Sequence, residues 1–348
     1  MSKQQILHVT GIEKFISSFI DLLEKRDDFA DHLFYIHGDE QKYPISRRKN
    51  TTFSKDYSGC FSAQFDLVKK MNSSKKIILH SLFDPKITAL LFLQPWLLKK
   101  CYWMIWGADL YNYQLAERNW KWHIKEFFRR PVIKRMGHLV TYIAGDVDLA
   151  RKWYGAIGKH HKCIMYTSNI YREYLVPVDS HDGINIQIGN SADPTNNHLE
   201  IFEKLFPFRN QNIFIYAPLS YGNQEYARSI IKAGVDQFGE KFIPMTDFMP
   251  FDDYLKFLGK IDIAIFNHKR QQAMGNTITL LGLGKKVYLR DDVTPWKMFE
   301  KIDAKVYSTS SINLTPISEN IKSHNQSIIK EHFSEKTLLD QLENIFKE

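Results

Sequence analysis

Cysteine is scarce in this sequence of 348 residues, where Cys60, Cys101 and Cys163 lie far apart and in no metal-ligand spacing. Three distant cysteines suggest neither a disulfide framework nor a zinc site, and they indicate a reducing compartment. No apolar run approaches the roughly 18 to 20 residues that a membrane-spanning helix needs. The first residues, MSKQQILHVTG, also lack the apolar stretch and the cleavage site of a signal peptide. We therefore expect a cytoplasmic protein, or one that sits on a membrane from its cytoplasmic side.

Several sequence motifs are absent as well, and each absence argues against a class of site. The sequence has no G-x-G-x-x-G and no Walker-type lysine loop, which speaks against a dinucleotide or ATP site. No D-x-D stands in a strand-end loop that would hold a divalent ion, because Asp146-Val147-Asp148 is predicted to begin a helix. We therefore expect neither a metal nor another cofactor.

The composition that remains is that of an ordinary globular chain, with 44% hydrophobic and 25% charged residues. Its length exceeds what one hydrophobic core usually supports, so we expect two domains of about 150 to 200 residues. The net charge of +8 is unevenly divided, since residues 1–175 carry +11 and residues 176–348 carry −3. A basic half indicates a polyanionic partner: nucleic acid, an anionic membrane or a pyrophosphate substrate. Nucleic acid is set aside, because no helix-turn-helix, RNP or zinc-finger pattern is present.

Short apolar runs alternate with longer amphipathic stretches, which is the pattern of βα units on a parallel sheet. The predicted strands are Ile6–Val9, Leu33–His37, Ile77–His80, Tyr102–Trp106, Leu139–Ile143, Cys163–Tyr166, Ile184–Gly189, Ile213–Ala217, Phe242–Met245, Ile261–Phe266 and Lys286–Arg290. The polar stretch Val176–Gly183 predicts a linker between domains of residues 1–177 and 178–348. An amphipathic helix over about Ser334 to Lys347 is expected after a loop rich in Ser, Asn and Thr.

Two doubly wound α/β halves joined by a short linker place a cleft between the carboxyl ends of two parallel sheets, where open α/β sheets bind ligands. We therefore predict an α/β protein of the GT-B type, with two Rossmann-like domains that face each other across a cleft. This arrangement leaves the C-terminal helix able to return to the N-terminal domain. Nucleotide-sugar transferases, some epimerases and some phosphorylases share the architecture, so the fold alone selects no reaction.

Two loops in the second half suit a diphosphate, one after the strand at 184–189 and one after the strand at 261–266. Each passes through small residues into a helix, so that backbone N–H groups and the helix dipole can reach an anion, and Arg270 adds a charged fork. The predicted diphosphate and nucleotide residues are Gly189, Asn190, Ser191, Arg270, Gln271, Gly275, Asn276 and Thr277. A single loop of this kind is more often an ordinary turn or helix cap. Two such loops at matching positions make a diphosphate site as good an interpretation as ordinary turns and caps.

Two strands of the first half end in polar residues where the cleft is expected. His80 ends one strand, with Asp84 just after it, and Asp109 follows the end of another. A carboxylate or imidazole held there by a rigid element suits the removal of a proton from a sugar hydroxyl. For His80 a hydrogen-bonded core histidine is the stronger interpretation, and for Asp109 a helix N-cap is as strong as a catalytic role.

Basic and aromatic residues alternate in Ala116–Met136, which carries seven Lys or Arg and two Glu. Amphipathic segments of this composition lie in membrane interfaces, where each basic residue near an anionic surface contributes about 1 kcal/mol. The predicted membrane or acceptor surface comprises Arg118, Trp120, Lys121, Trp122, Lys125, Phe128, Arg129 and Arg130. The alternative is a solvated helix whose aromatic residues face the core. Pro131 predicts a division of the segment into two helices.

Several of these stretches resemble one family, the bacterial transferases of 4-acetamido-4,6-dideoxy-D-galactose (Fuc4NAc), which is glycosyltransferase family 56. The matching stretches, between about residues 75 and 290, are IWGADLY at Ile105–Tyr111, GNS at Gly189–Ser191, NNH at Asn196–His198, Phe251-Asp252 with Tyr254-Leu255, Arg270-Gln271-Gln272 with Gly275, and also His80 and Pro85. The sequence differs at Ala273-Met274-Gly275-Asn276, where the family reads Gly-x-Gly-Thr. Residues 1–70 and the C-terminal tail look diverged from the family.

The resemblance implies a dTDP-linked deoxy sugar as donor and an oligosaccharide linked to undecaprenyl pyrophosphate as acceptor. It implies work at the cytoplasmic face of the bacterial inner membrane, in the synthesis of enterobacterial common antigen. The N-terminal domain would then face the acceptor and the anionic membrane, and the C-terminal domain would bind the nucleotide sugar. If the anomeric carbon is inverted, Asp109 is the first choice for general base and His80 the second. Arg270 and the backbone amides around Asn190–Ser191 and Gly275–Thr277 would stabilise the leaving pyrophosphate.

Two other functions stay open at this point. A two-domain epimerase or another nucleotide-sugar-modifying enzyme needs no lipid acceptor and has no use for the basic and aromatic segment. A catalytically silent protein that binds sugar nucleotides is a weaker alternative. The donor sugar and the acceptor glycan, which is common antigen, O-antigen or capsule repeat, are not determined, because a few pocket contacts discriminate between related sugars.

Overall fold

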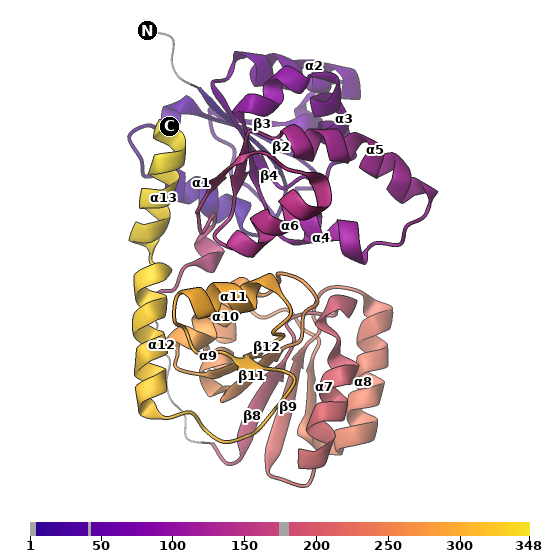
Figure 1. The fold of residues 1–348 in the computed structure, drawn as a ribbon, viewed down its shortest axis with the longest axis vertical. Helices are drawn as coiled ribbons and strands as arrows, with labels where there is room; N and C mark the ends of the chain where they lie inside the picture. The colour runs from indigo at the N-terminus through magenta and orange to yellow at the C-terminus, as the bar shows by residue number, and fades with distance from the viewer. Residues whose placement is uncertain (1–4, 41–42, 174–180) are drawn as a thin grey trace. The chain divides into compact units, whose positions relative to one another are not determined.

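The computed structural model describes residues 5–40, 43–173 and 181–348. The chain forms two compact units: an N-terminal unit of residues up to Ser168 together with Leu338–Glu348, and a C-terminal unit of Asn169–Thr337. The predicted linker Val176–Gly183 and the predicted boundary after residue 177 fall largely outside the described residues. Both units are α/β, as predicted, and each is built around a parallel sheet (Figure 1).

The sheet of the N-terminal unit has, within the described residues, the strand order β3-β2-β1-β4-β5-β6-β7. The strands are β1 (Ile6–Gly11), β2 (His32–His37), β3 (Thr51–Phe53), β4 (Lys76–His80), β5 (Cys101–Met104), β6 (His138–Val140) and β7 (Lys159–His161). The mostly apolar residues of the central strands suit a sheet that is covered on both faces. Strands β1 and β4 are neighbours although they are not consecutive in the chain, and such a switch point is where open α/β sheets bind ligands.

One face of this sheet is covered by α2 (Cys60–Ser73), α3 (Pro85–Leu93), α5 (Trp120–Arg135) and α6 (Ala144–Tyr154). Their apolar residues share one core cluster with inward side chains of the strands, such as Leu7. Helix α4 (Ala108–Leu115) begins in the loop after β5, so the two polar loops that follow β4 and β5 lead into helices of this layer.

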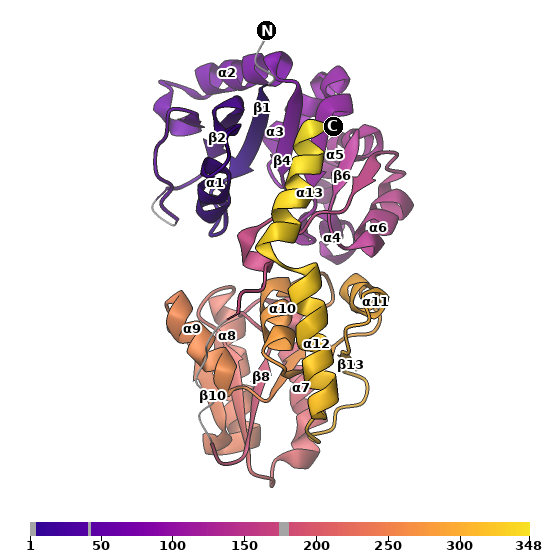
Figure 2. The ribbon, with the colours of Figure 1, turned by 90° about the vertical axis from the view of Figure 1, so that its left-hand side faces the viewer.

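The opposite face of the sheet is covered by α1 (Ile16–Glu24) and by α13 (Glu335–Lys347), which Figure 2 shows running beside the strands. Lys76, buried at the start of β4, donates hydrogen bonds to the carbonyls of Ile345 and of Phe346, the latter at 3.0 Å. These carbonyls belong to the last turn of α13, where a cation is favoured. The C-terminal helix therefore returns to the N-terminal unit, as the predicted fold allowed.

The sheet of the C-terminal unit has, in the part of the chain that is described, the strand order β10-β9-β8-β11-β12-β13. The strands are β8 (Ile184–Ile188), β9 (Ile213–Pro218), β10 (Phe242–Met245), β11 (Ile263–Phe266), β12 (Lys286–Leu289) and β13 (Tyr307–Ser308). The helices are α7 (His198–Leu205), α8 (Gln224–Phe238), α9 (Phe251–Lys260), α10 (Met274–Gly282), α11 (Thr294–Lys301) and α12 (Glu319–His332). The loops after β8 and β11, predicted to bind a diphosphate, follow two neighbouring strands at the centre of this sheet.

The predicted strand Cys163–Tyr166 is wrong, because the strand in this region is β7 and these four residues lie beyond it. They are almost fully buried, which explains their apolar pattern, but Met165 has a φ of +73°. That left-handed conformation is incompatible with a strand. Strands β3, β7 and β13 lie at or next to sheet edges and have two or three residues each, so they carry too little apolar pattern to be predicted.

Two helical predictions are also corrected. The region expected to be a loop contains α12, whose N-cap Ser318 accepts a hydrogen bond from the N–H of Ile321 and whose Ile329 is fully buried. Its remaining residues are largely polar, which hid the helix. Pro131 does not divide the basic segment, since α5 is one helix that contains it. A proline costs a helix one hydrogen bond, and the fully buried side chains of Val132 and Ile133 hold the following turn in place.

Candidate active site

The loop after β8 begins with Gly189, whose backbone has a φ of +62°. Glycine is required there, because a Cβ would lie 2.5 Å from His198 Nε2 and 2.6 Å from Asn196 Oδ1. The following N–H group, that of Asn190, donates to Asn196 Oδ1 at 2.9 Å. The predicted turn Gly189–Ser191 is therefore held by residues of the NNH stretch that follows it.

Two buried histidines support this turn. His268 Nε2 lies 2.8 Å from Asn196 Oδ1, and His198 Nδ1 lies 3.1 Å from Tyr226 Oη. Burial lowers the pKa of His268 to about 3 and the pKa of His198 to about 4. Both imidazoles are therefore neutral near pH 7, and they fix the turn without adding positive charge.

The loop after β11 is fastened to the loop after β8 by side-chain contacts. Arg270 Nη2 lies 3.2 Å from Asp193 Oδ2, Gln272 Nε2 donates to Asn190 Oδ1 at 3.1 Å, and Thr195 Oγ1 donates to Gln272 Oε1 at 2.8 Å. Burial alone would raise the pKa of Asp193, but hydrogen bonds from Thr195 and the charge of Arg270 bring it below its usual value. The structure thus brings the predicted residues Gly189, Asn190, Ser191, Arg270 and Gln271 into one polar cluster.

Helix α10 begins directly after this loop. Its N-cap Ala273, which stands where the family reads glycine, adopts the left-handed conformation with a φ of +53°. The backbone N–H groups of Met274, Gly275 and Asn276 have no carbonyl partner within the helix and suit an anion. The N–H of Thr277 is bound to the carbonyl of Ala273, and its hydroxyl donates to the same carbonyl. Gly275 and Asn276 therefore remain as predicted backbone donors, whereas Thr277 closes the first turn.

We call the turn Gly189–Ser191, the residues Arg270–Gln272 and the first turn of α10 the phosphate cluster. It offers one guanidinium and several backbone N–H groups at the carboxyl edge of a parallel sheet, which is the chemistry that binds a diphosphate. Among the described residues, no group of three or more His, Cys, Asp or Glu side chains is placed to hold a metal ion.

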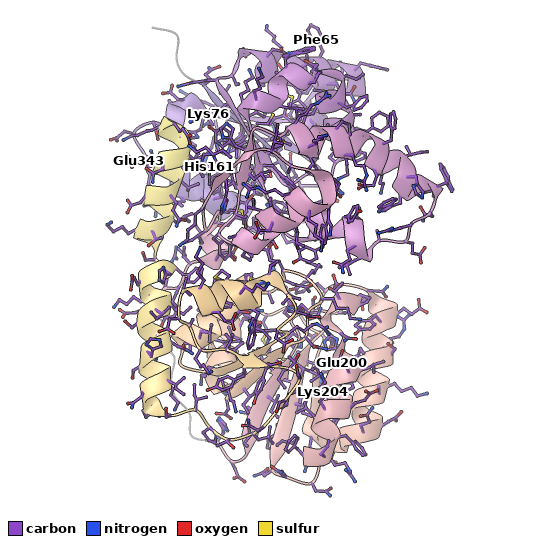
Figure 3. All side chains as sticks on the ribbon, in the orientation of Figure 1. Phe65, Lys76, His161, Glu200, Lys204 and Glu343 are labelled. Atoms are coloured by element: carbon purple, nitrogen blue, oxygen red, sulfur yellow. The ribbon has the colours of Figure 1, made fainter. Side chains whose placement is uncertain are left out.

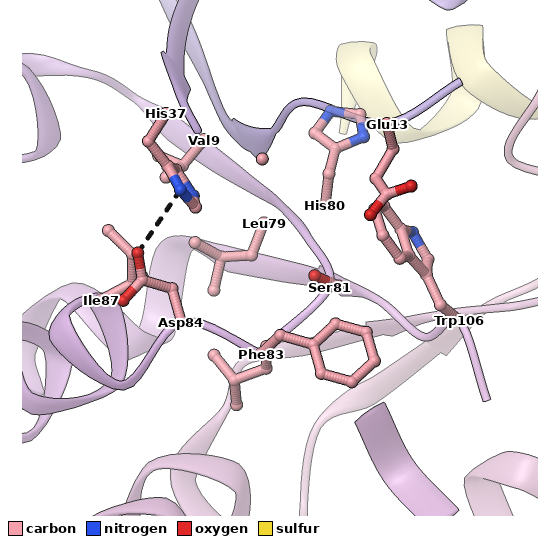
Figure 4. A pocket seen from close by; sticks show the side chains of 12 residues that line it. Val9, Glu13, His37, Leu79, His80, Ser81, Phe83, Asp84, Ile87 and Trp106 are labelled. Carbon is pink, nitrogen blue, oxygen red and sulfur yellow. Dashed lines mark ion pairs between the residues drawn. The ribbon is translucent and has the colours of Figure 1, made fainter. Parts of the chain in front are cut away.

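A pocket of about 250 Å³ opens at the carboxyl edge of the sheet in the N-terminal unit. Its walls include Glu13 after β1, His37 at the end of β2, the loop Ser81–Asp84 after β4 and Trp106 after β5. Figure 4 shows His37 and Asp84 on one side of the pocket and Glu13 and Trp106 on the other. The pocket therefore lies at the switch point between β1 and β4.

Asp109, the first choice for general base, does not reach this pocket. Its carboxylate is fully buried and accepts four hydrogen bonds. Oδ1 accepts from the N–H groups of Trp106 and Leu110, both at 3.0 Å, and Oδ2 accepts from the N–H of Leu82 at 3.0 Å and from Trp103 Nε1 at 2.8 Å. With every oxygen lone pair directed at a buried N–H group, Asp109 is placed as an internal support of the two loops. The position after a strand was predicted correctly, but the inward direction of the side chain has no sequence signal.

His80, the second choice, lines the pocket but has both ring nitrogens engaged. Nδ1 lies 2.6 Å from Tyr166 Oη, and Nε2 lies 3.0 Å from His8 Nδ1. His8 in turn lies 2.9 Å from His32, so three histidines form a buried file along β4, β1 and β2. Burial lowers the pKa of His80 to about 3. This arrangement matches the hydrogen-bonded core histidine that the sequence favoured for His80.

Sequence reasoning missed His37, which ends β2 as His80 ends β4. Its Nδ1 lies 3.4 Å from Asp84 Oδ2, and both side chains are only partly buried. The signal that could have found it is the same one that singled out His80: a polar residue at the carboxyl end of a predicted strand.

The predicted membrane or acceptor surface is divided by the structure. Trp122 and Arg129 are buried, and Arg129 Nη2 donates to the carbonyl of Asp109 at 2.7 Å, so these two residues belong to the interior. The exposed residues are Arg118, Trp120, Lys121, Lys125 and Arg130, and Phe128 is half-buried. Ile124 and Phe127, which were not selected, are 51% and 65% exposed.

Exposed apolar side chains continue from α5 onto neighbouring elements. Phe92 of α3 contacts the rings of Phe127 and Phe128, with centroids 5.7 and 5.1 Å away. Trp96 Nε1, in the turn after α3, donates to Asn72 Oδ1 of α2 at 3.1 Å. Other strongly exposed apolar side chains of this unit are Phe61 (87%) and Phe65 (73%, labelled in Figure 3) on α2, Leu93 (71%) on α3 and Trp96 (60%). We call these four residues together with Trp120, Ile124 and Phe127 the apolar surface. No helix in the described part of the chain is long and apolar enough to span a bilayer.

Two α/β units whose parallel sheets carry polar loops at their carboxyl edges are typical of the GT-B fold, and solved structures confirm this fold. The glycosyltransferase from Rickettsia africae ESF-5 aligns with a TM-score of 0.62 at 14% identity, over 100% of this chain and 98% of its own. HepE from Anabaena, in complex with UDP and glucose, aligns with a TM-score of 0.68 at 10% identity, over 99% of both chains. Sucrose-phosphate synthase from Thermosynechococcus elongatus aligns with a TM-score of 0.66 at 10% identity, over 99% of this chain and 98% of its own.

The family follows from the sequence match. Residues 51–322, more than three quarters of the chain, match the family described as 4-alpha-L-fucosyltransferase, glycosyl transferase group 56. The chain therefore belongs to glycosyltransferase family 56, and it is a glycosyltransferase that uses a nucleotide-sugar donor and a glycan acceptor. This confirms the resemblance drawn from IWGADLY, GNS and RQQ, and it favours a transferase over the epimerase.

Proposed function

We propose that this enzyme transfers 4-acetamido-4,6-dideoxygalactose, or a related deoxy sugar, from dTDP to an oligosaccharide linked to undecaprenyl pyrophosphate. The observation that carries the proposal is the phosphate cluster, which joins two strand-end loops and a helix N-terminus into one anion site. The dTDP carrier, the deoxy sugar and the lipid-linked acceptor, with a role in common antigen synthesis, come from the family resemblance.

In this proposal the phosphate cluster stabilises the charge that develops on the leaving dTDP. Arg270 now faces the single carboxylate of Asp193 at 3.2 Å, and a diphosphate brings at least two negative charges to the same guanidinium. The N–H groups at the start of α10 are fixed by the helix, so they need no reorganisation when the sugar–phosphate bond breaks. Under this proposal the reaction needs no metal, and EDTA leaves turnover unchanged.

The acceptor is proposed to be reached at a membrane. Lys121 and Lys125 are exposed on α5 beside Trp120 and Ile124, so positive charge and apolar area stand on one helix. Such a combination suits an anionic phospholipid surface, where apolar side chains enter the interface and the basic side chains meet headgroups. A peripheral position at the cytoplasmic face of the inner membrane is part of the proposal.

Titration calorimetry with dTDP, UDP and GDP tests the donor half. We expect the tightest binding for dTDP, and we expect Arg270→Ala to weaken it about 10- to 100-fold, because a charge-assisted hydrogen bond contributes about 1.5 to 3 kcal/mol. The control is Arg209→Ala, which removes an exposed arginine of the same unit that caps its own turn. Equal loss in both variants, or tighter binding of UDP or GDP than of dTDP, contradicts this part of the proposal.

A further inference from the structure

The pocket of the N-terminal unit contains an imidazole and a carboxylate that are paired with each other. His37 Nδ1 faces Asp84 Oδ2 at 3.4 Å; His37 is the last residue of β2, and Asp84 lies in the loop between β4 and α3 (Figure 4). The His37 side chain is 27% exposed and the Asp84 side chain is 24% exposed. With Nδ1 directed at the carboxylate, Nε2 is the ring nitrogen left for a group that enters the pocket.

Asp84 is held in place by backbone contacts. It is the N-cap of α3, and its Oδ1 accepts a hydrogen bond from the N–H of Lys86 at 2.7 Å. One carboxylate oxygen is thereby fixed at the N-terminus of a helix. The other oxygen is left to orient His37, so the pair is organised before any substrate arrives.

The loop that carries Asp84 is fixed from behind by Asp109. The N–H of Leu82 donates to Asp109 Oδ2 at 3.0 Å, and the N–H of Trp106, across the pocket, donates to Asp109 Oδ1 at the same distance. Ser81, the first residue after β4, adopts a left-handed φ of +77°, a conformation that costs free energy and is concentrated at functional sites. Asp109, which was predicted from the sequence as the general base, therefore positions the two walls of the pocket.

We propose that His37, oriented by Asp84, is the general base that activates the acceptor hydroxyl, and that Asp109 is the positioning residue of the loop. This assignment rests on the proposed transferase function. The hydroxyl proton moves to His37 Nε2 while the hydroxyl oxygen forms a bond to the anomeric carbon of the donor. The bond from that carbon to the phosphate oxygen breaks, its electron pair leaves on the nucleoside diphosphate, and the imidazolium later releases the proton to water. The anomeric configuration is inverted in this step.

The protonation state of His37 agrees with that role. Burial lowers the pKa of His37, the carboxylate of Asp84 acts to raise it, and the ammonium of Lys86 acts to lower it again. The imidazole is therefore neutral at pH 7 and able to accept a proton. Glu13 on the opposite wall is the other carboxylate of the pocket, and it is the rival base that the experiment has to separate from His37.

The test measures kcat, KM and the pH profile of sugar transfer for His37→Gln, Asp84→Asn and Glu13→Gln. We expect His37→Gln to lower kcat at least 100-fold with little change in KM for the donor, as for a lost proton-transfer group. Asp84→Asn keeps a good N-cap, lowers kcat at least tenfold and moves the acidic limb of the profile to lower pH, because the charge that raises the pKa of His37 is gone. Glu13→Gln keeps the wild-type limb.

The matched control is His324→Gln, which removes another paired imidazole, with Nε2 3.2 Å from Asp303 Oδ2, in the C-terminal unit. Near-normal turnover in His37→Gln, loss confined to Glu13→Gln, or a product of retained configuration overturns the assignment. If the wild type transfers no sugar from dTDP, the proposed function fails instead. The interaction between His37 and Asp84 is then tested by NMR titration of His37. The pKa of His37 must fall in Asp84→Asn, and an unchanged pKa overturns the pairing.

Discussion

Single buried side chains decide what the two polar loops of the N-terminal unit can do. Asp109 accepts from four N–H groups, and Arg129 donates to its carbonyl at 2.7 Å, so this residue joins the loops after β4 and β5 to α5. Asp109 therefore affects catalysis indirectly, because it holds the loops of Asp84 and Trp106 in positions where a substrate would contact them. His80 has the same kind of role through Tyr166 and His8.

Asp109→Asn is predicted to weaken the fold and the catalyst together. The amide replaces one acceptor oxygen by an NH₂ group that faces two buried N–H donors, and each unsatisfied group costs about 1 to 3 kcal/mol. Urea unfolding followed by tryptophan fluorescence measures this in the N-terminal unit, which holds six of the seven tryptophans. We also expect kcat to fall at least tenfold, with dTDP affinity unchanged.

One result would instead support Asp109 as the general base. If the variant is as stable as the wild type while its turnover falls 100-fold or more, the carboxylate takes part in the chemistry itself. Arg151→Ala, which removes an exposed arginine of α6, is the control for stability in the same unit.

At the scale of elements, three strands share a line of imidazoles inside the N-terminal unit. His32, His8 and His80 lie on β2, β1 and β4, and successive ring nitrogens are 2.9 and 3.0 Å apart. Each ring can donate one hydrogen bond and accept one only while it is neutral, so three neutral imidazoles suit the two contacts between the rings. A proton added to any of them would place a charge among buried rings.

The stability of the N-terminal unit is predicted to fall with pH in a defined window. Burial lowers the pKa of His32 to about 4 and of His80 to about 3, from a usual value of 6.5. Below pH 6.5 the unfolded chain takes up protons that the folded chain does not, so the contribution is complete above pH 6.5 and is lost as the pH falls to about 4 for His32 and to about 3 for His80. Each such histidine costs up to about 1.4 kcal/mol per pH unit. Urea unfolding at pH 7 and pH 5 measures the slope.

Two histidine variants test whether this pH dependence of stability comes from the buried histidines. His80→Gln is expected to reduce the dependence on pH, whereas His123→Gln, which changes an exposed side chain of α5, keeps the wild-type slope. A slope that is the same in all three proteins contradicts the assignment to the buried file.

A second element-scale feature is the apolar surface over α2, α3 and α5. We predict that vesicles with anionic phospholipid sediment the protein at low salt, and that high salt weakens the binding because exposed charges are screened. Trp120→Ser combined with Phe127→Ser should lower the partition coefficient at least tenfold, since each buried aromatic side chain contributes about 1.5 to 3 kcal/mol. Phe206→Ser, at an exposed site of the C-terminal unit, is the control. Binding that is independent of lipid charge and of these variants contradicts a membrane role.

At the scale of the whole molecule, much more of the fold than of the candidate site could be predicted from the sequence. Alternation of apolar runs with amphipathic stretches located the central strands of both sheets, because these strands are buried on both faces. Edge strands such as β13 and the polar helix α12 were missed, since their contacts come from tertiary packing. The loops at Gly189 and Arg270 could be predicted to lie after two strands because the residues that make them are small or charged, and their role in binding stays a prediction. The direction of Asp109 and the partner of His37 depend on how β2, β4 and β5 align, which no local pattern encodes.

One reaction tests the proposed sugar transfer most directly. Purified protein is mixed with dTDP-4-acetamido-4,6-dideoxygalactose and vesicles that contain an undecaprenyl-pyrophosphate-linked oligosaccharide, and the lipid product and released dTDP are measured. We expect one sugar added per dTDP released, with neither product when the acceptor is omitted and with a greatly reduced rate in Arg270→Ala. Release of dTDP without glycosylated lipid, or transfer only from a UDP-linked sugar, would contradict it.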